Sequence, residues 1–155
     1  MVKMKLTGMK ELERALLDLG KEYGDPKYAL QAMRPAMKKA VEPLVDNIKA
    51  NTPVDDGDLR DSSKFKIRKA NTKDKDVFGQ DSIIVAEAGW IWAAGKGTYA
   101  KALAVEYGTS NKKAQPVLRR ALEANAGSMI STFKEELAKS IKKKAKQLAK
   151  KSVKK

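Results

Sequence analysis

The chain has 155 residues and a mass of 17.1 kDa, which is the size of one ordinary domain, with or without a short extension. Hydrophobic residues make up 42% of it, charged residues 34%, and the formal charge is +14; this balance is too apolar for a chain disordered throughout and too polar for a bilayer. It contains no Cys and no His, which excludes disulfides, thiolate or imidazole metal ligands, and Ser-His-Asp or Cys-His catalysis. An enzyme of this composition would depend on carboxylates or lysines alone.

The N-terminus is predicted to form a strand and then a helix. Val2, Met4 and Leu6 alternate with polar residues, mostly lysines, as in a half-buried strand. An apolar stripe over residues 9–19 then indicates an amphipathic helix. Neither segment is apolar enough for a signal peptide or a membrane span, so we expect a soluble protein of intracellular origin.

A second helix is predicted from Asp25 to Asn51. Asp25 suits the N-cap and Pro26 suits the first helical position. Pro35 and Pro43 each remove a backbone donor and crowd the preceding turn. We therefore expect a break near residue 34 and a kink near residue 42.

The middle of the chain is predicted to be a loop followed by strands. Residues 52–61 are rich in Asp, Pro and Gly, with Asp58 as the expected cap of a short helix. Alternation at 64–68 and an apolar run at 83–90 indicate two strands, joined by a long polar connection over 71–81 that we expect to be mobile. After a loop at 95–97, residues 99–106 fit a short helix closed by Gly108.

The C-terminal third is predicted to be one long helix from about residue 116 to about residue 150. Its apolar residues recur at steps of three or four, and Pro116 suits the first turn. Nine lysines and no acidic residue lie within 139–155, which leaves 24 basic and 19 acidic residues in the rest of the chain. Most of the excess charge therefore belongs to residues 139–155. The predicted stripe is Leu118, Leu122, Ala126, Ile130, Phe133, Leu137, Ile141, Ala145 and Leu148.

These elements predict an α+β fold: a small antiparallel sheet packed by two or three helices, plus a long lysine-rich amphipathic helix. We place the domain at residues 1–137 and a helical extension at 138–155.

Other candidate sites have simpler interpretations. The Asp-rich loop lacks the glycine and the glutamate that an EF-hand needs at its sixth and twelfth positions. Glu87 and Glu106 are not spaced as a catalytic pair, and salt bridges to nearby lysines are the expected role. Trp90 and Trp92 stand two residues apart, so we expect a core or subunit-interface position for both, with stacking on nucleic-acid bases as the sharper alternative.

Four stretches, in this order and spacing, resemble the neck or tail-completion proteins of long-tailed bacteriophages, also described as minor tail components or head–tail joining proteins. They are LTGMKEL at 6–12, ANTPVDDGDLRDS at 50–62, YA at 99–100 with VEYGT at 105–109, and QPVLRRAL at 115–122. The chain departs from the family pattern at Asp56, where Thr is common, and at Arg120, where Pro is usual. The lysine-rich segment after about Leu137 lies outside the resemblance.

The resemblance implies a structural subunit of the virion with no enzymatic activity, no cofactor and no metal. It implies a homo-oligomeric ring, with a hexamer favoured over a dodecamer, between connector or head-closure proteins and tail-terminator proteins. The subunit would be made in the cytoplasm of the bacterial host and would have no membrane partner.

Within the family pattern, several residues are interpreted as fold-defining turns, and we expect Gly57 and Gly108 to adopt a positive φ or to allow a close backbone approach. Trp90, Trp92 and Tyr107 are the candidate interface aromatics. The fold-defining residues are Pro53, Gly57, Leu59, Glu106, Gly108, Thr109 and Pro116.

The alternative function is that of a basic DNA-binding or DNA-compacting protein that uses the C-terminal helix. In a neck protein the same helix would face genomic DNA in the channel or acidic neighbouring rings. The candidate contacts are Lys139, Lys142, Lys143, Lys144, Lys146, Lys150 and Lys151.

Overall fold

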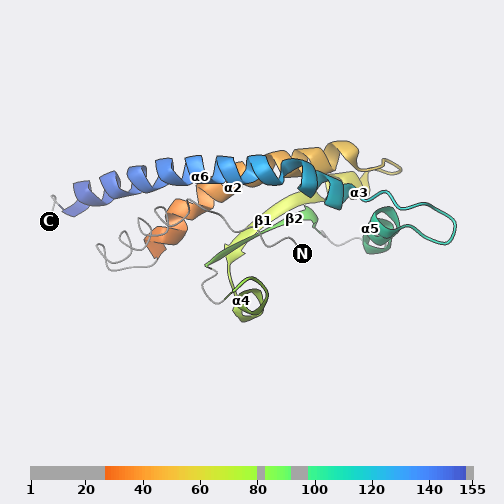
Figure 1. Ribbon diagram of the computed structural model, residues 1–155, viewed down its shortest axis with the longest axis horizontal. Helices are drawn as coiled ribbons and strands as arrows, with labels where there is room; N and C mark the ends of the chain where they lie inside the picture. Colours follow the sequence, from red (N-terminus) through yellow and green to blue (C-terminus); the bar gives the residue numbers. More distant parts are fainter. Residues whose placement is uncertain (1–26, 80–82, 92–97, 153–155) are drawn as a thin grey trace. The chain divides into compact units, whose positions relative to one another are not determined.

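The computed structural model describes residues 27–79, 83–91 and 98–152 (Figure 1). Within these residues, helices and strands combine in one α+β chain, which confirms the predicted class. The elements are α2 (Lys27–Asn51), α3 (Asp58–Asp61), β1 (Ser63–Lys69), α4 (Thr72–Phe78), β2 (Ile84–Trp90), α5 (Thr98–Tyr107) and α6 (Val117–Ser152).

The chain divides into two compact units, which are described separately. Unit 1 consists of residues 1–39, 69–84 and 131–155, and unit 2 consists of residues 40–68 and 85–130. The domain boundary predicted after residue 137 falls inside α6, which continues without interruption, and it stays a prediction.

Helix α2 ends at Asn51 as predicted, but the break expected near residue 34 is wrong. Pro35 and Pro43 both lie inside one continuous helix. Both prolines are exposed, whereas Ala32 and Ala36 on another face are almost fully buried. Packing of that small-residue face stabilises the helix. Each proline therefore removes one backbone N–H donor without ending the helix. The kink expected near residue 42 stays a prediction.

Strands β1 and β2 pair in an antiparallel two-stranded sheet, as predicted. Backbone hydrogen bonds just beyond the strand ends set the register. Ala70 N donates to Ile83 O at 3.0 Å, and Ile91 N donates to Ser62 O at 2.9 Å. The strands therefore run close together along their whole length, as Figure 1 shows.

The connection between the strands contains a helix, α4, where a mobile polar segment was expected. Its start is a capping box: Asp74 N donates to Asn71 Oδ1 at 2.9 Å, and Asn71 N donates to Asp74 Oδ2 at 2.7 Å. This reciprocal pair satisfies two helix-start donors and shields the Asp74 side chain. The polarity of the segment therefore reflects helix capping.

The core of unit 2 surrounds Trp90, for which the core position is the one observed. Trp90 is 6% exposed, and its Nε1 donates to Thr52 Oγ1 at 3.0 Å. Thr52 Oγ1 in turn donates to Ile48 O at 2.6 Å, so the polar atom of the buried indole has a partner. The buried cluster comprises Leu44, Ile48, Leu59, Trp90, Ala102, Val117 and Ala121.

In unit 1, the beginning of α2 lies beside the C-terminal half of α6. Lys39 Nζ pairs with Glu136 Oε2 at 3.0 Å. About two turns further along α6, Lys144 Nζ lies 5.2 Å from the centre of the Tyr28 ring. Leu137 is buried at 1% exposure on the same helix. These contacts determine which side of α6 faces the unit and which side faces solvent.

Helix α6 begins directly after Pro116 and runs for 36 residues, close to the predicted bounds. Its buried positions differ in part from the predicted stripe, because Val117 and Ala121 enter the core of unit 2 while Leu122 is 53% exposed. Leu118 and Leu137 of the predicted stripe do pack inside, so the stripe is right in part and its start is shifted toward Val117 and Ala121.

Several predicted features lie outside the described residues. These are the strand at 2–6, the helix at 9–19, the Asp25-Pro26 helix start, the loop at 95–97, and Trp92.

Both glycines singled out as turn residues have positive φ, which confirms that prediction: +87° at Gly57 and +79° at Gly108. Their surroundings differ. A Cβ on Gly108 would lie 2.8 Å from both Ala114 N and Lys112 O, whereas a Cβ on Gly57 would have only the Arg60 guanidinium nearby, at 3.8 Å. Gly108 therefore meets both a conformational and a steric requirement, and Gly57 meets the first alone.

We expect Gly108→Ala to destabilise the protein more than Gly57→Ala. The left-handed conformation costs each alanine about 1–2 kcal/mol. At Gly108 the contact with rigid backbone atoms should add about 1–3 kcal/mol. Urea unfolding of the two matched variants measures the difference, and equal losses would contradict the close approach at Gly108.

Candidate functional site

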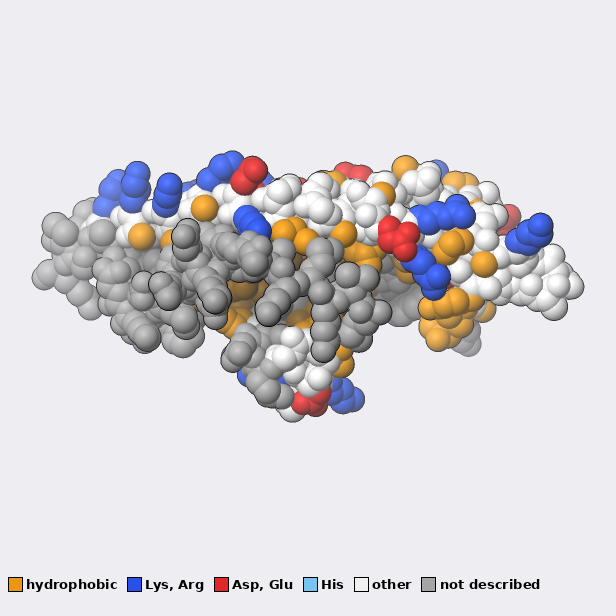
Figure 2. Space-filling model, viewed as in Figure 1, with side chains coloured by type: hydrophobic (Ala, Val, Ile, Leu, Met, Phe, Trp, Pro, Cys, Tyr) orange, Lys and Arg blue, Asp and Glu red, His pale blue; other side chains and the backbone are white. Residues whose placement is uncertain are grey.

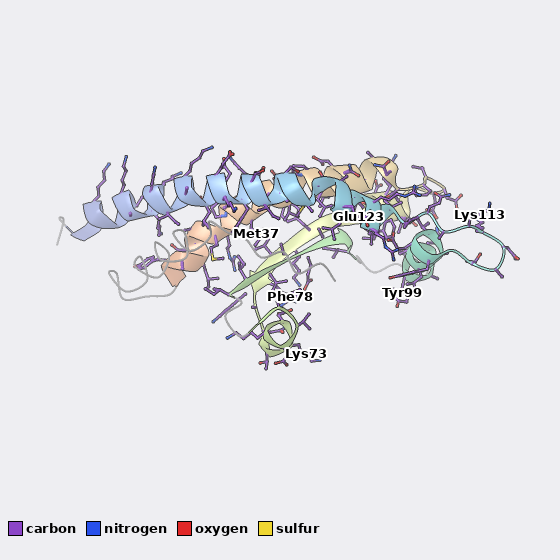
Figure 3. All side chains as sticks on the ribbon, in the orientation of Figure 1. Met37, Lys73, Phe78, Tyr99, Lys113 and Glu123 are labelled. Carbon is purple, nitrogen blue, oxygen red and sulfur yellow. The ribbon has the colours of Figure 1, made fainter. Side chains whose placement is uncertain are left out.

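A pocket of about 630 Å³ lies in unit 2, where the turn after α2 and helix α3 meet helix α5 and the loop that follows it. Figure 3 labels Tyr99 on α5 and Lys113 in that loop. The pocket therefore brings together two stretches, 53–59 and 101–115, that are far apart in the sequence. Its lining residues are Pro53, Asp55, Asp56, Gly57, Leu59, Lys101, Ala104, Val105, Lys112, Lys113 and Gln115.

One wall of the pocket is the connection between α5 and α6. Helix α5 ends at Tyr107, and the N of the next residue, Gly108, donates to Ala104 O at 2.9 Å. Thr109 and Lys112 then pair as an isolated antiparallel bridge. Gln115 N then donates a hydrogen bond to Val105 O, on α5, at 2.7 Å. The loop is thus bonded back onto the helix it leaves, so it forms a fixed wall.

The carboxylate of Glu106 caps the N-terminus of α6. Leu118 N donates to Glu106 Oε2 at 2.9 Å, and Arg119 N donates to Oε1 at 3.2 Å. Both amides belong to the first turn, where backbone donors have no partner within the helix. A negative charge at this end is also favoured by the helix dipole. Glu106, for which lysine salt bridges were expected, instead binds backbone.

Glu87 also has a partner other than the expected lysine. Arg68 Nε donates to Glu87 Oε1 at 2.8 Å across the sheet. The two carboxylates that were considered as a catalytic pair are therefore engaged in separate structural contacts.

An ion pair between Asp56 and Lys101 joins the two walls of the pocket. The Lys101 ammonium, by donating a hydrogen bond, lowers the pKa of Asp56 below its ordinary value of 3.8, and the same bond raises the pKa of Lys101 above 10.5. Asp56 Oδ1 also accepts from Asp58 N at 3.2 Å. Helix α3 begins at Asp58, and Gly57 occupies its N-cap position. The capping role predicted for Asp58 is therefore wrong.

Among the described residues, no group of acidic residues is arranged to hold a metal ion. None of the helices described combines the length and apolarity needed to cross a membrane.

The residues predicted as fold-defining turns all lie in unit 2, around the pocket or beside it. Leu59 is buried in the core. Thr109 Oγ1 accepts from Lys112 N at 3.1 Å and so closes the turn after Gly108. Pro116 O accepts the first α6 bond, from Arg120 N at 3.1 Å. These contacts describe local structure, and the assignment of these residues as family turns stays a prediction.

Helix α5 carries an exposed apolar stripe that sequence reasoning found only in part. Tyr99, Leu103 and Tyr107 are spaced four residues apart and are 61%, 40% and 70% exposed. Of these three residues, Tyr107 alone was among the predicted interface aromatics. The four-residue spacing is visible in the sequence. The sequence does not show which face of α5 is buried in the core, and therefore does not show that this face is exposed.

A second exposed apolar surface, the α4 patch, lies in unit 1 and was not predicted. It consists of Val77, Phe78 and Ile83, which are 55%, 64% and 43% exposed. Figure 3 labels Phe78 on α4. Because the segment was interpreted as a polar connection, its two apolar residues were not considered as a surface.

The seven predicted lysine contacts differ in their surroundings. Lys139 Nζ pairs with Glu136 Oε1 at 2.8 Å, which raises its pKa above 10.5, and Lys144 donates to Gln31. The side chain of Lys151 lies outside the described residues. The remaining four, Lys142, Lys143, Lys146 and Lys150, are exposed. Contact with DNA or with an acidic partner stays a prediction for all of them.

Comparison with known proteins matches the chain to a family model. The model is described as "Bacteriophage HK97-gp10, putative tail-component", and it covers residues 11–115. No curated protein and no solved structure matches the chain. The matched range contains the whole pocket but ends before α6.

We expect Glu106→Ala to destabilise the protein by about 1–2 kcal/mol, because two first-turn amides of α6 lose their acceptor. Glu106→Gln keeps one acceptor oxygen and should cost less. Urea unfolding measures both. Glu123→Ala, an exposed position on α6, is the control and should change stability by no more than about 0.5 kcal/mol. A loss at Glu123 equal to that at Glu106 would rule out the capping role.

We expect Lys101→Gln to raise the pKa of Asp56 toward 3.8, since the hydrogen bond from Lys101 is its largest cause of lowering. In the native protein the pair stabilises the fold between two limits. Its contribution is lost as the pH falls through the lowered pKa of Asp56 or rises through the raised pKa of Lys101. NMR titration of the Asp56 carboxylate tests this. Lys113→Gln, at the same pocket, should leave the Asp56 pKa unchanged.

Proposed function

The chain belongs to the HK97-gp10-like family of bacteriophage tail components, and on this basis we propose that it is a neck or tail-completion subunit that assembles into a homo-oligomeric ring at the head–tail junction. Its role in the virion is structural rather than enzymatic. The single observation that carries the ring assembly is the presence of two separate exposed apolar surfaces, the α5 stripe and the α4 patch, on one small chain.

Exposure of this kind favours protein contact. Large aromatic side chains bury much area at low cost in conformational entropy, and they dominate the energetics of protein interfaces. Tyr99 and Tyr107 provide this chemistry on α5, and Phe78 provides it on α4. Isolated exposed apolar residues are ordinary on a protein surface, but a stripe with a four-residue period along one helix is a contiguous surface.

A closed ring requires two different surfaces on every subunit, because each subunit contacts its two neighbours through opposite sides of a heterologous interface. We assign the α5 stripe to one side of the contact and the α4 patch to the other. The ring proposed is a hexamer in preference to a dodecamer, and its neighbours are connector or head-closure proteins and tail-terminator proteins.

The Asp56–Lys101 pair and the Glu106 cap support this role indirectly. They hold α5 against α3 and against the start of α6 by polar contacts. Helix α5 thus has a defined orientation before any partner binds, which lowers the entropic cost of association.

Paired surface variants test the heterologous contact. We expect Tyr99→Ser/Tyr107→Ser to abolish the ring by removing one side, and Phe78→Ser to abolish it by removing the other. An equimolar mixture of the two variants should form dimers but no ring, because each supplies the surface that the other lacks. Light scattering after size-exclusion chromatography measures the masses.

The control is Leu122→Gln, which changes an exposed apolar residue of neither surface and should leave the ring intact. A wild-type protein that stays monomeric would contradict ring assembly in the free protein. Dimers formed by the Phe78→Ser variant alone would instead show that the α5 stripe pairs with itself, and the heterologous assignment would then be wrong.

A further inference from the structure

Four lysines of α6 form one continuous exposed surface, here called the lysine ridge: Lys142, Lys143, Lys146 and Lys150. Lys142, Lys146 and Lys150 are spaced four residues apart, and Lys143 lies three before Lys146, which places all four on one side of the helix. The ridge lies in unit 1, outside the range matched by the family model, so its chemistry has to be explained separately from that of the tail-component fold.

Packing of α6 against α2 turns the ridge toward solvent. Leu137 is buried on the other side of α6, and Lys144, one position away from the ridge in sequence, lies over the Tyr28 ring and donates to Gln31. Figure 2 shows Lys and Arg side chains gathered over the C-terminal half of α6. The structure therefore separates lysines that hold α6 in place from lysines that are available to a ligand.

The ridge is not neutralised by the part of the chain that the structure describes. The last acidic residue of α6 is Glu136, and its carboxylate is already shared between Lys39 and Lys139. The ridge lysines themselves form no ion pair within the described residues. Like charges three and four residues apart destabilise a helix, so a bound polyanion would relieve a repulsion present in the free protein.

We propose that the lysine ridge binds the phosphate backbone of duplex DNA. The residue types favour phosphate over an acidic protein surface, because lysine is depleted at protein interfaces, where aromatic residues and arginine are enriched. The ridge contains neither. Its lack of aromatic side chains also disfavours single strands, which are bound largely by stacking of bases on such residues.

The dimensions of the ridge fit backbone contact without sequence reading. From Lys142 to Lys150 the helix rises about 12 Å, which corresponds to between three and four base-pair steps of about 3.4 Å. Four ammonium groups over this length can neutralise up to four phosphates. Lysine is a flexible point charge with no fixed geometry for base edges, so the binding should be independent of sequence.

The test is the salt dependence of binding to a 20-base-pair DNA duplex, measured by fluorescence anisotropy with the full chain. We expect the ridge variant K142Q/K143Q/K146Q/K150Q to flatten the slope of log Kobs against log salt by about 3 to 4, at about 0.9 per phosphate. Its affinity at low salt should fall at least about tenfold. The matched control K49Q/K64Q/K66Q/K113Q removes the same charge from exposed positions elsewhere and should change the slope by less than about 1.

Three further measurements decide the interpretation. The variant K142R/K143R/K146R/K150R keeps the charge and should bind as the wild type does, which separates charge from folding, and circular dichroism checks that all variants keep their helix content. Equal losses in the ridge and control variants would show that net charge alone binds DNA and would overturn the proposal. Ridge-dependent binding of poly-glutamate as tight as that of DNA would overturn the choice of ligand. The mass of the assembly should be the same for every variant, so failure of the ridge and failure of the ring are seen separately.

Discussion

The structure of unit 2 depends on the way that α6 starts. A helix of 36 residues begins with backbone amides that have no partner inside it, and two of these are bound by the carboxylate of Glu106 on the preceding helix. The tight turn at Gly108 makes this possible, because it reverses the chain within a few residues and lets the loop bond back to Val105. The end of α5 and the start of α6 are therefore one joint, and neither helix can rotate without breaking it.

This joint explains why the surface of α5 is organised as it is. Ala102 and Val105 face the core beside Val117, and Lys101 is paired with Asp56 across the pocket. The remaining side of the helix then carries Tyr99, Leu103 and Tyr107 at high exposure. A building block needs such a surface held rigidly, and here the rigidity comes from hydrogen bonds and an ion pair made elsewhere on the same helix.

The distribution of charge follows a related principle. Nine lysines and no acidic residue lie within 139–155, which accounts for most of the net charge of +14, yet these lysines are not equivalent. Lys144 contacts Tyr28 and Gln31 of α2, and Lys139 pairs with Glu136, whereas the ridge lysines from Lys142 to Lys150 are exposed and make no ion pair within the described residues. The apolar side of α6 thus selects, by its burial, which cations remain available for a polyanion. The same helix serves as scaffold on one side and as a charged surface on the other.

The sequence by itself determined the α+β class, the approximate bounds of α5 and α6, the positive φ at Gly57 and Gly108, and the concentration of lysine near the C-terminus, because all of these depend on local periodicity and backbone preference. Local signals were also misread: the prolines of α2 suggested a break, and the Asn71–Asp74 capping box was taken for loop polarity. Only the tertiary structure decided that Glu106 caps α6, that Trp90 lies in the core, and which faces of α5 and α6 stay exposed. Those outcomes depend on contacts between residues distant in the sequence, and the burial of one face is what determines the opposite one.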